Sequence, residues 1–368
     1  MTEKKITQLQ LVSIGLCYVF GTIVVSVFVS AVTGNESWIV GPLAAICFIP
    51  TMLVYASITK KFPGKGLFEI NEAVFGSIAG HILSGVYLVF FLSLCSLNVL
   101  EATNFLYYFI MPDTPLLAIA IFLVAACVYC VRTGLFAIAR VSTVFCIAAL
   151  AALSFSVILS LNHANFDFLF PIFNLKPLDY VQGIHVATSI PFGESIFLLM
   201  LVPDLSEKVS IKKSYILVMI ATGFLVMMIH FREVVSLGPM LLYTTQPSFE
   251  SVRLINISDI FSRTESLFAL LLVSLTFFKT LILFYITLKG VTQIFRLDSY
   301  KHLTIMAAAL LTILAIESYG SPSNNIFWGK NVSPFIWTFF TSIIPLITLL
   351  SAAVKDRFSF SKKRIGNS

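Results

Sequence analysis

Charged residues are scarce in this chain of 368 residues, and their scarcity excludes most soluble folds. Asp, Glu, Lys and Arg make up only 11% of the sequence, whereas a soluble domain carries about 25%. Hydrophobic residues reach 58%, and the mean hydropathy is +0.95. A chain of this composition cannot hide its apolar side chains inside one water-facing globule. We therefore predict an integral membrane protein.

The patterns on which most enzymes depend are also lacking. The sequence contains no glycine-rich nucleotide-binding loop, no cluster of metal ligands and no nucleophile paired with a base. Its five histidines are scattered, mostly near the ends of predicted helices: His81, His163, His185, His230 and His302. We therefore predict neither an enzyme nor a bound cofactor or metal.

Cysteines are few, and all six lie within predicted apolar spans: Cys17, Cys47, Cys95, Cys127, Cys130 and Cys146. Cys127 and Cys130 have the CxxC spacing of redox and metal motifs, but no second Cys/His pair accompanies them. Cysteines in such surroundings behave as small apolar residues. We interpret all six as packing residues.

Long apolar runs, by contrast, fill the chain. A helix needs about 20 apolar residues to cross a bilayer, and runs of this kind recur at 9–32, 37–58, 82–106, 115–131, 139–161, 184–203, 215–237, 266–289, 302–318 and 334–354. The first run extends well beyond the core of a signal peptide, which has about 7–15 residues, so we interpret it as a retained helix. We predict an all-α membrane domain over 1–368 with about ten transmembrane helices.

Basic residues predict the orientation. Loops rich in Lys and Arg stay on the cytoplasmic side, and most of the 24 basic residues flank alternate loops or lie in the tail at 355–368. The opposite loops hold only Lys176, Arg253, Arg263 and Lys330. We predict that both termini are cytoplasmic, as an even number of spans requires. The net charge of +6 is thereby explained, and no basic patch remains to bind nucleic acid.

Two stretches are too polar or too interrupted to span the membrane. Residues 60–80 predict a short amphipathic helix on the cytoplasmic surface. Its apolar stripe would be Leu67, Phe68, Ile70, Val74 and Phe75, opposite Glu69, Asn71 and Glu72. Residues 237–266 contain Pro239 and Pro247 and predict either an external lid or a plain surface loop.

Ten spans divide into two halves of five, at 9–161 and 184–354. An odd number of spans inverts the second half relative to the first, as in LeuT-like secondary transporters, whose first helix in each half is broken at the midplane. Gly15 and Gly21 interrupt the first span, and Pro191 and Gly193 interrupt the sixth. Both residue types weaken a helix, and unwound backbone at that depth must be buried in protein or line a cavity. We predict breaks beside a cavity, with ordinary kinks as the alternative.

Two charges inside predicted spans are the strongest site candidates. A charge at mid-bilayer costs about 2.5–3.5 kcal/mol on insertion scales, so it usually faces a partner or a cavity. Glu194 could bind the amine of a ligand, or could brace the break through hydrogen bonds. Lys279 could stand where sodium-coupled transporters hold a cation between helices 1 and 8, or could pair structurally with Glu194 or Glu101.

The third span adds a polar face. Ser93, Leu97 and Glu101 recur every four residues and so share one side of a helix. Glu101 lies about two turns from the outer end, where it would line an access path, or would only pack or snorkel. Nearer the outer side, the run HFRE at 230–233 predicts an interfacial ion pair.

Several stretches together resemble a known family. They are ITQLQLVSIGLCYVFGTIVVSVF, FPGKGLFEINEAVFGSIAG, PFGESIFLLMLVPDL, LGPMLLYTTQPSFESVRLIN and FSRTESLFALLLVSLTFFKTLILFY. In this order and spacing they resemble the B-type permease subunits of bacterial spore germinant receptors, within the amino acid-polyamine-organocation superfamily. The resemblance covers nearly the whole chain and implies a ten-helix, transporter-like fold in the inner membrane of the spore.

The same resemblance implies partners and a site. The family senses small germinants, often amino acids, together with an A subunit and a lipoprotein C subunit. Its pocket between helices 1, 3, 6 and 8 points here to Gly21, Thr22, Ser93, Leu94, Leu97, Gly193, Glu194 and Lys279. An ion or proton path would use Glu101, Glu194 and Lys279. Ile23 replaces a glycine common in relatives, which implies a narrower pocket and a different germinant, or weak binding that relies on partners.

Two functions stay open at this point. A receptor subunit would bind a germinant and shift between conformations, which requires unequal affinity for the two states. A proton-coupled amino acid symporter would carry its substrate through by rocking one helix bundle against the other. Charged residues inside the predicted spans are compatible with both functions.

Overall fold

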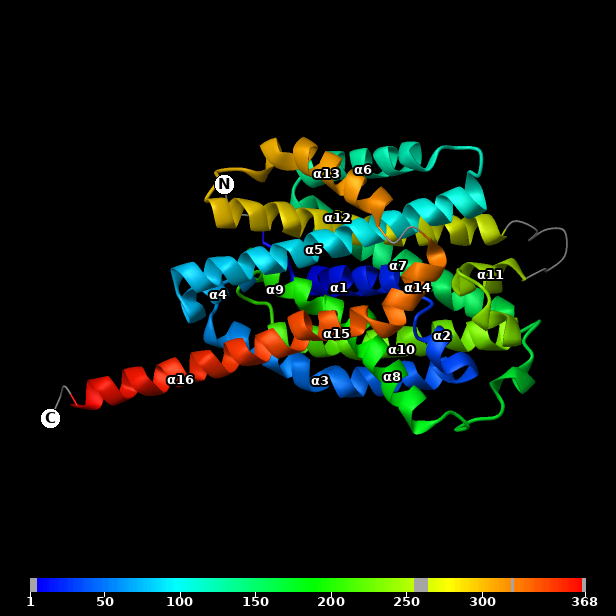
Figure 1. The fold of residues 1–368 in the computed structure, drawn as a ribbon, viewed down its shortest axis with the longest axis horizontal. Helices are drawn as coiled ribbons and strands as arrows, with labels where there is room; N and C mark the ends of the chain where they lie inside the picture. Colours follow the sequence, from blue (N-terminus) through cyan, green and yellow to red (C-terminus); the bar gives the residue numbers. More distant parts are fainter. Residues whose placement is uncertain (1–4, 255–263, 319–320, 366–368) are drawn as a thin grey trace.

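The computed structural model describes residues 5–254, 264–318 and 321–365, which form a bundle of helices (Figure 1). Over these residues, eight helical segments are long and apolar enough to cross a membrane, and two shorter apolar helices accompany them. Large apolar side chains face outward, as lipid contact requires; Phe122 and Val144 are 76% and 71% exposed. The predicted all-α membrane protein with about ten spans is confirmed.

Most spans are single helices. They are α3 (Ser37–Lys61), α5 (Ser77–Phe105), α6 (Leu116–Arg132), α7 (Leu135–Ser160), α10 (Ile211–Leu237), α12 (Thr264–Phe295) and α13 (Thr304–Glu317). The tenth span joins α15 (Ser333–Thr338) to α16 (Ile344–Ile365) through a π-helical turn, and the short α14 (Pro322–Asn331) precedes it. Every predicted span overlaps one of the observed helical segments.

The first span is broken, as predicted, but not at the predicted glycines, because Gly15 and Gly21 stay within regular helix and serve close packing. α1 (Gln8–Ile23) ends before a non-helical stretch at 24–29, and α2 (Ser30–Thr33) resumes the helix. The stretch reads VVSVFV, and β-branched valines lose rotamer freedom in a helix, which favours a break there. Residues 11–23 are all buried, because α1 runs through the centre of the bundle against α7, α10 and α12 (Figure 1).

The sixth span is irregular but not unwound. α8 (Pro177–Ala187) passes into a π-helical turn at Thr188–Phe192, a 3₁₀ turn at Gly193–Phe197 and α9 (Leu198–Leu201). Pro191 has no N–H to donate, so the α-helical bonding pattern cannot continue past it. The interruption therefore falls at the predicted residues, while the backbone stays helical.

The amphipathic helix predicted within 60–80 is α4 (Leu67–Phe75). Four side chains of the predicted apolar stripe are buried: Leu67, Phe68, Ile70 and Val74. Asn71 was assigned to the polar side, and that assignment is wrong, because α4 packs between α5 and α16 and buries it completely. Its side-chain amide donates to Ser84 Oγ at 3.3 Å.

The stretch predicted as a lid or loop at 237–266 contains α11 (Pro247–Arg253), which packs against α10 and α12. Residues 255–263 of this stretch lie outside the described part of the chain. The part that is described covers the end of α10, so it is a packed segment and not an open loop.

Glu36 anchors the connection between the fifth and sixth spans. It is 1% exposed, and its carboxylate accepts the backbone N–H groups of Phe173 at 3.1 Å and Asn174 at 2.9 Å. The Tyr180 hydroxyl donates to the same carboxylate. The connection is therefore held to the turn between the first and second spans by a buried carboxylate with several donors.

Both chain termini lie at one end of the bundle, and α16 extends beyond it there (Figure 1). The backbone of Ile6 pairs with Asp204 and Ser206 at this end, with N–H to oxygen distances of 2.9 and 3.0 Å. The N-terminal segment is thus tied to the end of the sixth span. That this end faces the cytoplasm stays a prediction from the basic residues.

Candidate functional site

Glu194 and Lys279 form an ion pair in the interior of the bundle. Lys279 Nζ lies 2.8 Å from Glu194 Oε2, and the two side chains are 7% and 2% exposed, respectively. The Thr22 hydroxyl donates to the same carboxylate oxygen at 2.8 Å. The first, sixth and eighth spans therefore meet at one carboxylate oxygen.

Local sequence places each of these groups. Thr22 lies in the last turn of α1, directly before the non-helical stretch, and Glu194 lies in the 3₁₀ turn that follows Pro191. Lys279 lies midway along α12, and its Nζ is 5.4 Å from the centre of the Tyr18 ring, whose face attracts a cation. Of the structural pairings expected for Lys279, the structure contains the one with Glu194.

Two glycines of the predicted site serve close helix packing. A Cβ at Gly21 would lie 2.7 Å from the carbonyl oxygen of Leu275, and a Cβ at Gly193 would lie 2.9 Å from Thr341 Oγ1. Because such distances leave no room for a side chain, Gly21 lets α1 approach α12, and Gly193 lets the sixth span approach the tenth. Neither residue lines the cavity described next.

A cavity of about 50 Å³ adjoins the ion pair. Its wall includes six predicted site or path residues: Thr22, Leu94, Leu97, Glu101, Glu194 and Lys279. The cavity has room for a few water molecules, since each needs about 10–15 Å³, and it is far smaller than the roughly 300–1,000 Å³ of most small-molecule sites. A ligand can therefore enter only if the lining side chains move apart.

Ser93 lies outside this cavity. It is exposed on the outer surface of α5, and its hydroxyl donates to the Val89 carbonyl at 2.8 Å. Two steps of four residues rotate an α-helix by about 80° beyond full turns, so Ser93 and Glu101 do not face the same way. The side of α5 that faces the cavity is made by Leu94, Leu97, Asn98 and Glu101.

The sequence did not point to the part of the wall that comes from the tenth span and the short helix before it. Asn325, Gly329, Ser333 and Trp337 lie in α14 and α15 and complete the enclosure. The polar run SPSNN at 321–325 was the available signal, since it stands directly before an apolar span. Ile23, expected to narrow the pocket, is buried in the core and does not line this cavity.

A second cavity of about 30 Å³ lies toward the end opposite the termini and shares Val25, Phe28, Glu101 and Asn325 with the first. The Asn325 amide donates to the Glu101 carboxylate. The Phe28 ring rests on Gly329, where a Cβ would lie 2.3 Å from a ring carbon. Phe28 and the Glu101–Asn325 hydrogen bond therefore form the boundary between the two cavities.

The charged run at 230–233 lies in the last turns of α10 and is buried within the protein, while its interfacial depth stays a prediction. His230, Arg232 and Glu233 are at most 2% exposed, because α11 covers this part of α10. His230 Nδ1 and Glu233 Oε2 lie 2.9 Å apart, a contact that is an ion pair when the imidazole is protonated. Arg232 donates instead to Ser156 Oγ at 2.7 Å and to the Ser248 carbonyl at 3.1 Å.

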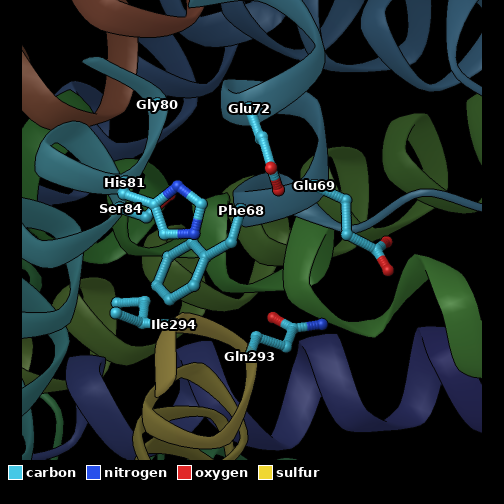
Figure 2. Close-up of a pocket in the computed structure, with 8 residues that line it drawn as sticks. All are labelled: Phe68, Glu69, Glu72, Gly80, His81, Ser84, Gln293 and Ile294. Carbon is cyan, nitrogen blue, oxygen red and sulfur yellow. The ribbon is translucent and has the colours of Figure 1, made fainter. Parts of the chain in front are cut away.

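A wider pocket of about 210 Å³ lies beside α4, between α5 and α12, at the end that carries the termini (Figure 2). Its wall carries Glu69, Glu72 and His81. Glu69 Oε2 accepts the N–H of Gly66 at 2.8 Å, and Glu72 Oε1 lies 3.9 Å from a guanidinium nitrogen of Arg296. Since both carboxylates have partners within the protein, we assign no ligand to this pocket.

Comparison with known proteins identifies the family. The sequence profile described as spore germination protein matches residues 5–321. The chain belongs to this family. Spore germination protein KB of Bacillus subtilis (strain 168) is 23% identical over 336 residues, which cover 89% of each chain. Spore germination protein B2 of the same strain is 24% identical and covers 81% of this chain and 82% of its own.

Solved structures show the same fold in transporters. MhsT in complex with L-phenylalanine matches with a TM-score of 0.65 at 14% identity, covering 94% of this chain and 88% of MhsT. Mhp1, a nucleobase-cation-symport-1 family transporter in a closed conformation with bromovinylhydantoin bound, matches with a TM-score of 0.64 at 15% identity, covering 88% and 74%. At these identities the likeness concerns the fold alone, and it confirms the predicted LeuT-like architecture.

Proposed function

We propose that this chain is a transporter-like subunit of a germinant receptor, which binds a small germinant in the cavity beside Glu194 and Lys279 and signals spore germination. Membership of the spore germination protein family supports the role in germination. The location of the site is proposed from the buried ion pair between Glu194 and Lys279. Thr22, at the broken end of the first span, donates a hydrogen bond to the carboxylate of this pair.

A buried ion pair is a costly way to hold helices together. Apolar residues of similar volume stabilise a fold as well or better, because both charges must lose their hydration. This pair lies beside a cavity and between two helix interruptions. Such a position suits an equilibrium between two conformations, which a ligand shifts by binding one of them more tightly.

The predicted ligand residues then have distinct tasks. Thr22, Glu194 and Lys279 would contact the polar groups of the germinant, and Leu94 and Leu97 would contact its apolar part. Gly21 and Gly193 would set the helix spacing. Ser93, which is exposed on α5, has no direct task in this arrangement.

The family resemblance extends the proposal to the assembly. We propose that the chain works with an A subunit and a lipoprotein C subunit in the inner membrane of the spore, with both termini in the cytoplasm. The same resemblance makes amino acids the first germinants to test.

A proton-coupled amino acid symporter is the second candidate. The fold shared with Mhp1 and MhsT favours it, as does the row of ionisable groups at Glu101, Glu194 and Lys279 along one cavity wall. In that case Glu194 or Glu101 would take the driving proton.

One experiment separates the candidates. The purified full chain in liposomes is assayed for uptake of labelled amino acids with and without a proton gradient, and for equilibrium binding of the same panel. Glu194→Gln is compared with wild type, and Glu72→Gln serves as the control at a carboxylate outside the cavity. Binding without uptake, weakened only by Glu194→Gln, supports the receptor subunit.

Saturable uptake that depends on the gradient and is lost in Glu194→Gln supports the symporter. If neither binding nor uptake occurs, the binding assay is repeated with the A and C subunits present. Failure there too would refute a germinant site at Glu194.

A further inference from the structure

We propose that residues 166–175, in the connection between the fifth and sixth spans, form a membrane-docking segment. Its phenylalanine side chains insert into the bilayer leaflet at the end of the bundle opposite the termini. The segment thereby holds parts of both interrupted spans at the bilayer surface. This role goes beyond the proposed function, since it does not depend on a germinant site.

The membrane-docking segment has an inward and an outward side. Phe168 and Leu169 pack against a buried apolar cluster at the end of α10. Phe166, Phe170 and Phe173 are instead 50%, 65% and 75% exposed. Burial of a phenylalanine side chain away from water is favourable, and an exposed group of apolar side chains marks an interaction surface. The three exposed rings therefore require a partner surface.

Buried and partly buried polar groups hold the backbone of the segment. The Glu36 carboxylate accepts the N–H of Phe173 at 3.1 Å, and the Asn35 amide donates to the carbonyl oxygens of Leu169 at 3.3 Å and Pro171 at 3.2 Å. Phe173 has a φ of 61°, which is rare for a bulky side chain. Such a conformation persists only where its surroundings hold it. A fixed backbone therefore presents the exposed rings.

The position of the segment favours the bilayer as its partner. It lies at the edge of the bundle, at the end opposite the termini, and leads directly into α8 (Figure 1). α8 opens a helical segment long and apolar enough to cross a membrane, and its first turns expose Leu178 and Val181. The exposed phenylalanines continue this apolar side to the end of the span. Apolar side chains at that level insert at the boundary between headgroups and acyl chains.

Charges near the rings do not select a charged partner. Asp167, Lys176 and Asp179 are all exposed and carry both signs, so the segment presents no field of one sign. We therefore expect docking by apolar insertion. A second copy of the chain is the other occupant that an apolar surface could take, and the test below distinguishes it from lipid.

The segment is tied to both interrupted spans. Glu36 lies in the turn directly after α2, which resumes the first span, and Tyr180 of α8 donates to the same carboxylate. A Cβ at Gly183 of α8 would lie 2.3 Å from Thr33 Cγ2 of α2, so these two helices are in close contact. Movement of α2 and α8 would therefore carry the segment with it, and lipid around the rings would resist that movement.

The test uses the full chain reconstituted into liposomes of phosphatidylcholine and phosphatidylglycerol. p-Benzoyl-L-phenylalanine, which cross-links to neighbouring C–H groups under ultraviolet light, replaces Phe170 or Phe173. The same amino acid at Phe122, which is exposed in the middle of α6, is the positive control. At Glu207, an exposed charged residue in the turn after the sixth span, it gives the background. Mass spectrometry of the intact protein measures the attached phospholipid.

We expect lipid attachment at Phe170 and Phe173 to lie within about threefold of that at Phe122 and at least about tenfold above that at Glu207, because inserted rings contact acyl chains. Glu36→Gln should lower attachment at Phe173 by at least about threefold, since the backbone N–H loses its charged acceptor. Glu250→Gln, at a partly exposed ion pair, is the matched control and should leave it unchanged.

Attachment at Phe170 and Phe173 no higher than at Glu207 overturns the membrane-docking segment. A covalent dimer of the chain in place of the lipid product also overturns it and assigns the surface to a second copy. Unchanged attachment at Phe173 in Glu36→Gln overturns the role of Glu36 in holding the rings. Because no germinant takes part, none of these results alters the proposed function.

Discussion

The hydroxyl of Thr22 lies 2.8 Å from Glu194 Oε2, although 172 positions separate the two residues in the sequence. Thr22 stands at the break of the first span, and Glu194 stands at the irregular turns of the sixth. One hydrogen bond therefore joins the two helix interruptions. A change in the bonding of Glu194 is transmitted directly to the first span.

Thr22→Val removes this hydrogen bond while nearly conserving shape. Because the bond is made to a carboxylate, we expect the free energy of unfolding to fall by about 1.5–3 kcal/mol. Denaturant titration of the purified protein in detergent measures the change. Thr22→Ser keeps the hydroxyl and should lose much less; equal losses in the two variants would argue that the bond has no energetic role.

Gly21→Ala tests the close approach of α1 to α12. The new methyl group would lie 2.7 Å from the Leu275 carbonyl oxygen, so we expect a loss of about 1–3 kcal/mol from overpacking. Gly85→Ala is the matched control, since no atom lies within 4 Å of a Cβ there, and alanine should stabilise that helix position slightly. The comparison uses thermal unfolding, and a neutral Gly21→Ala would contradict the tight contact.

Gly329→Ala tests the boundary between the two cavities. The added methyl group would overlap the Phe28 ring. The ring would swing away to relieve about 1 kcal/mol of overpacking strain, and this movement would open the boundary between the two cavities. We expect Ser26→Cys, on the cavity wall, to react about fivefold faster with a small cationic methanethiosulfonate when Gly329→Ala is also present.

The parent chain without Ser26→Cys sets the background rate from the native cysteines. Gly85→Ala combined with Ser26→Cys controls for general loosening of the bundle. An unchanged rate in the Gly329→Ala background would show that Phe28 does not limit access.

Glu36→Gln tests the anchor of the connection between the fifth and sixth spans. The amide keeps the shape but loses the charge that holds two backbone N–H groups and the Tyr180 hydroxyl, so we expect a loss of about 1.5–3 kcal/mol. Protease cleavage at 161–176 should become faster. Glu250→Gln, in a partly exposed ion pair with Arg253 at 3.5 Å, should change stability by less than about 1 kcal/mol.

Features that depend on residues adjacent in the sequence were predictable from the sequence. The spans follow from local hydropathy, and the interruption of the sixth span follows from Pro191, which weakens its own backbone. The break of the first span lies at 24–29, beyond the glycine from which it was predicted. Glu194 and Lys279 were recognised as site candidates for the same reason, because each is a charged residue among apolar residues adjacent in the sequence. Their pairing was one of the alternatives and needed the structure to choose it.

Features that depend on the neighbouring helices were not predictable. Asn71 was assigned to a polar face and is buried, because α4 packs against α5, whose Ser84 accepts a hydrogen bond from its amide. The run at 230–233 gave no sign that α11 would cover it. Ser93 shares a sequence period with Glu101, yet the rotation of α5 directs it outward.

The amino-acid sequence by itself determined that this is a ten-span membrane protein with interrupted first and sixth helices, because hydropathy and helix-breaking act over a few consecutive residues. Only the tertiary structure decided which side chains meet. Thr22, Glu194 and Lys279 come from three distant segments, and the wall formed by α14 comes from a fourth. Such contacts arise from the packing of whole helices, in which the position and rotation of each helix depend on all the others.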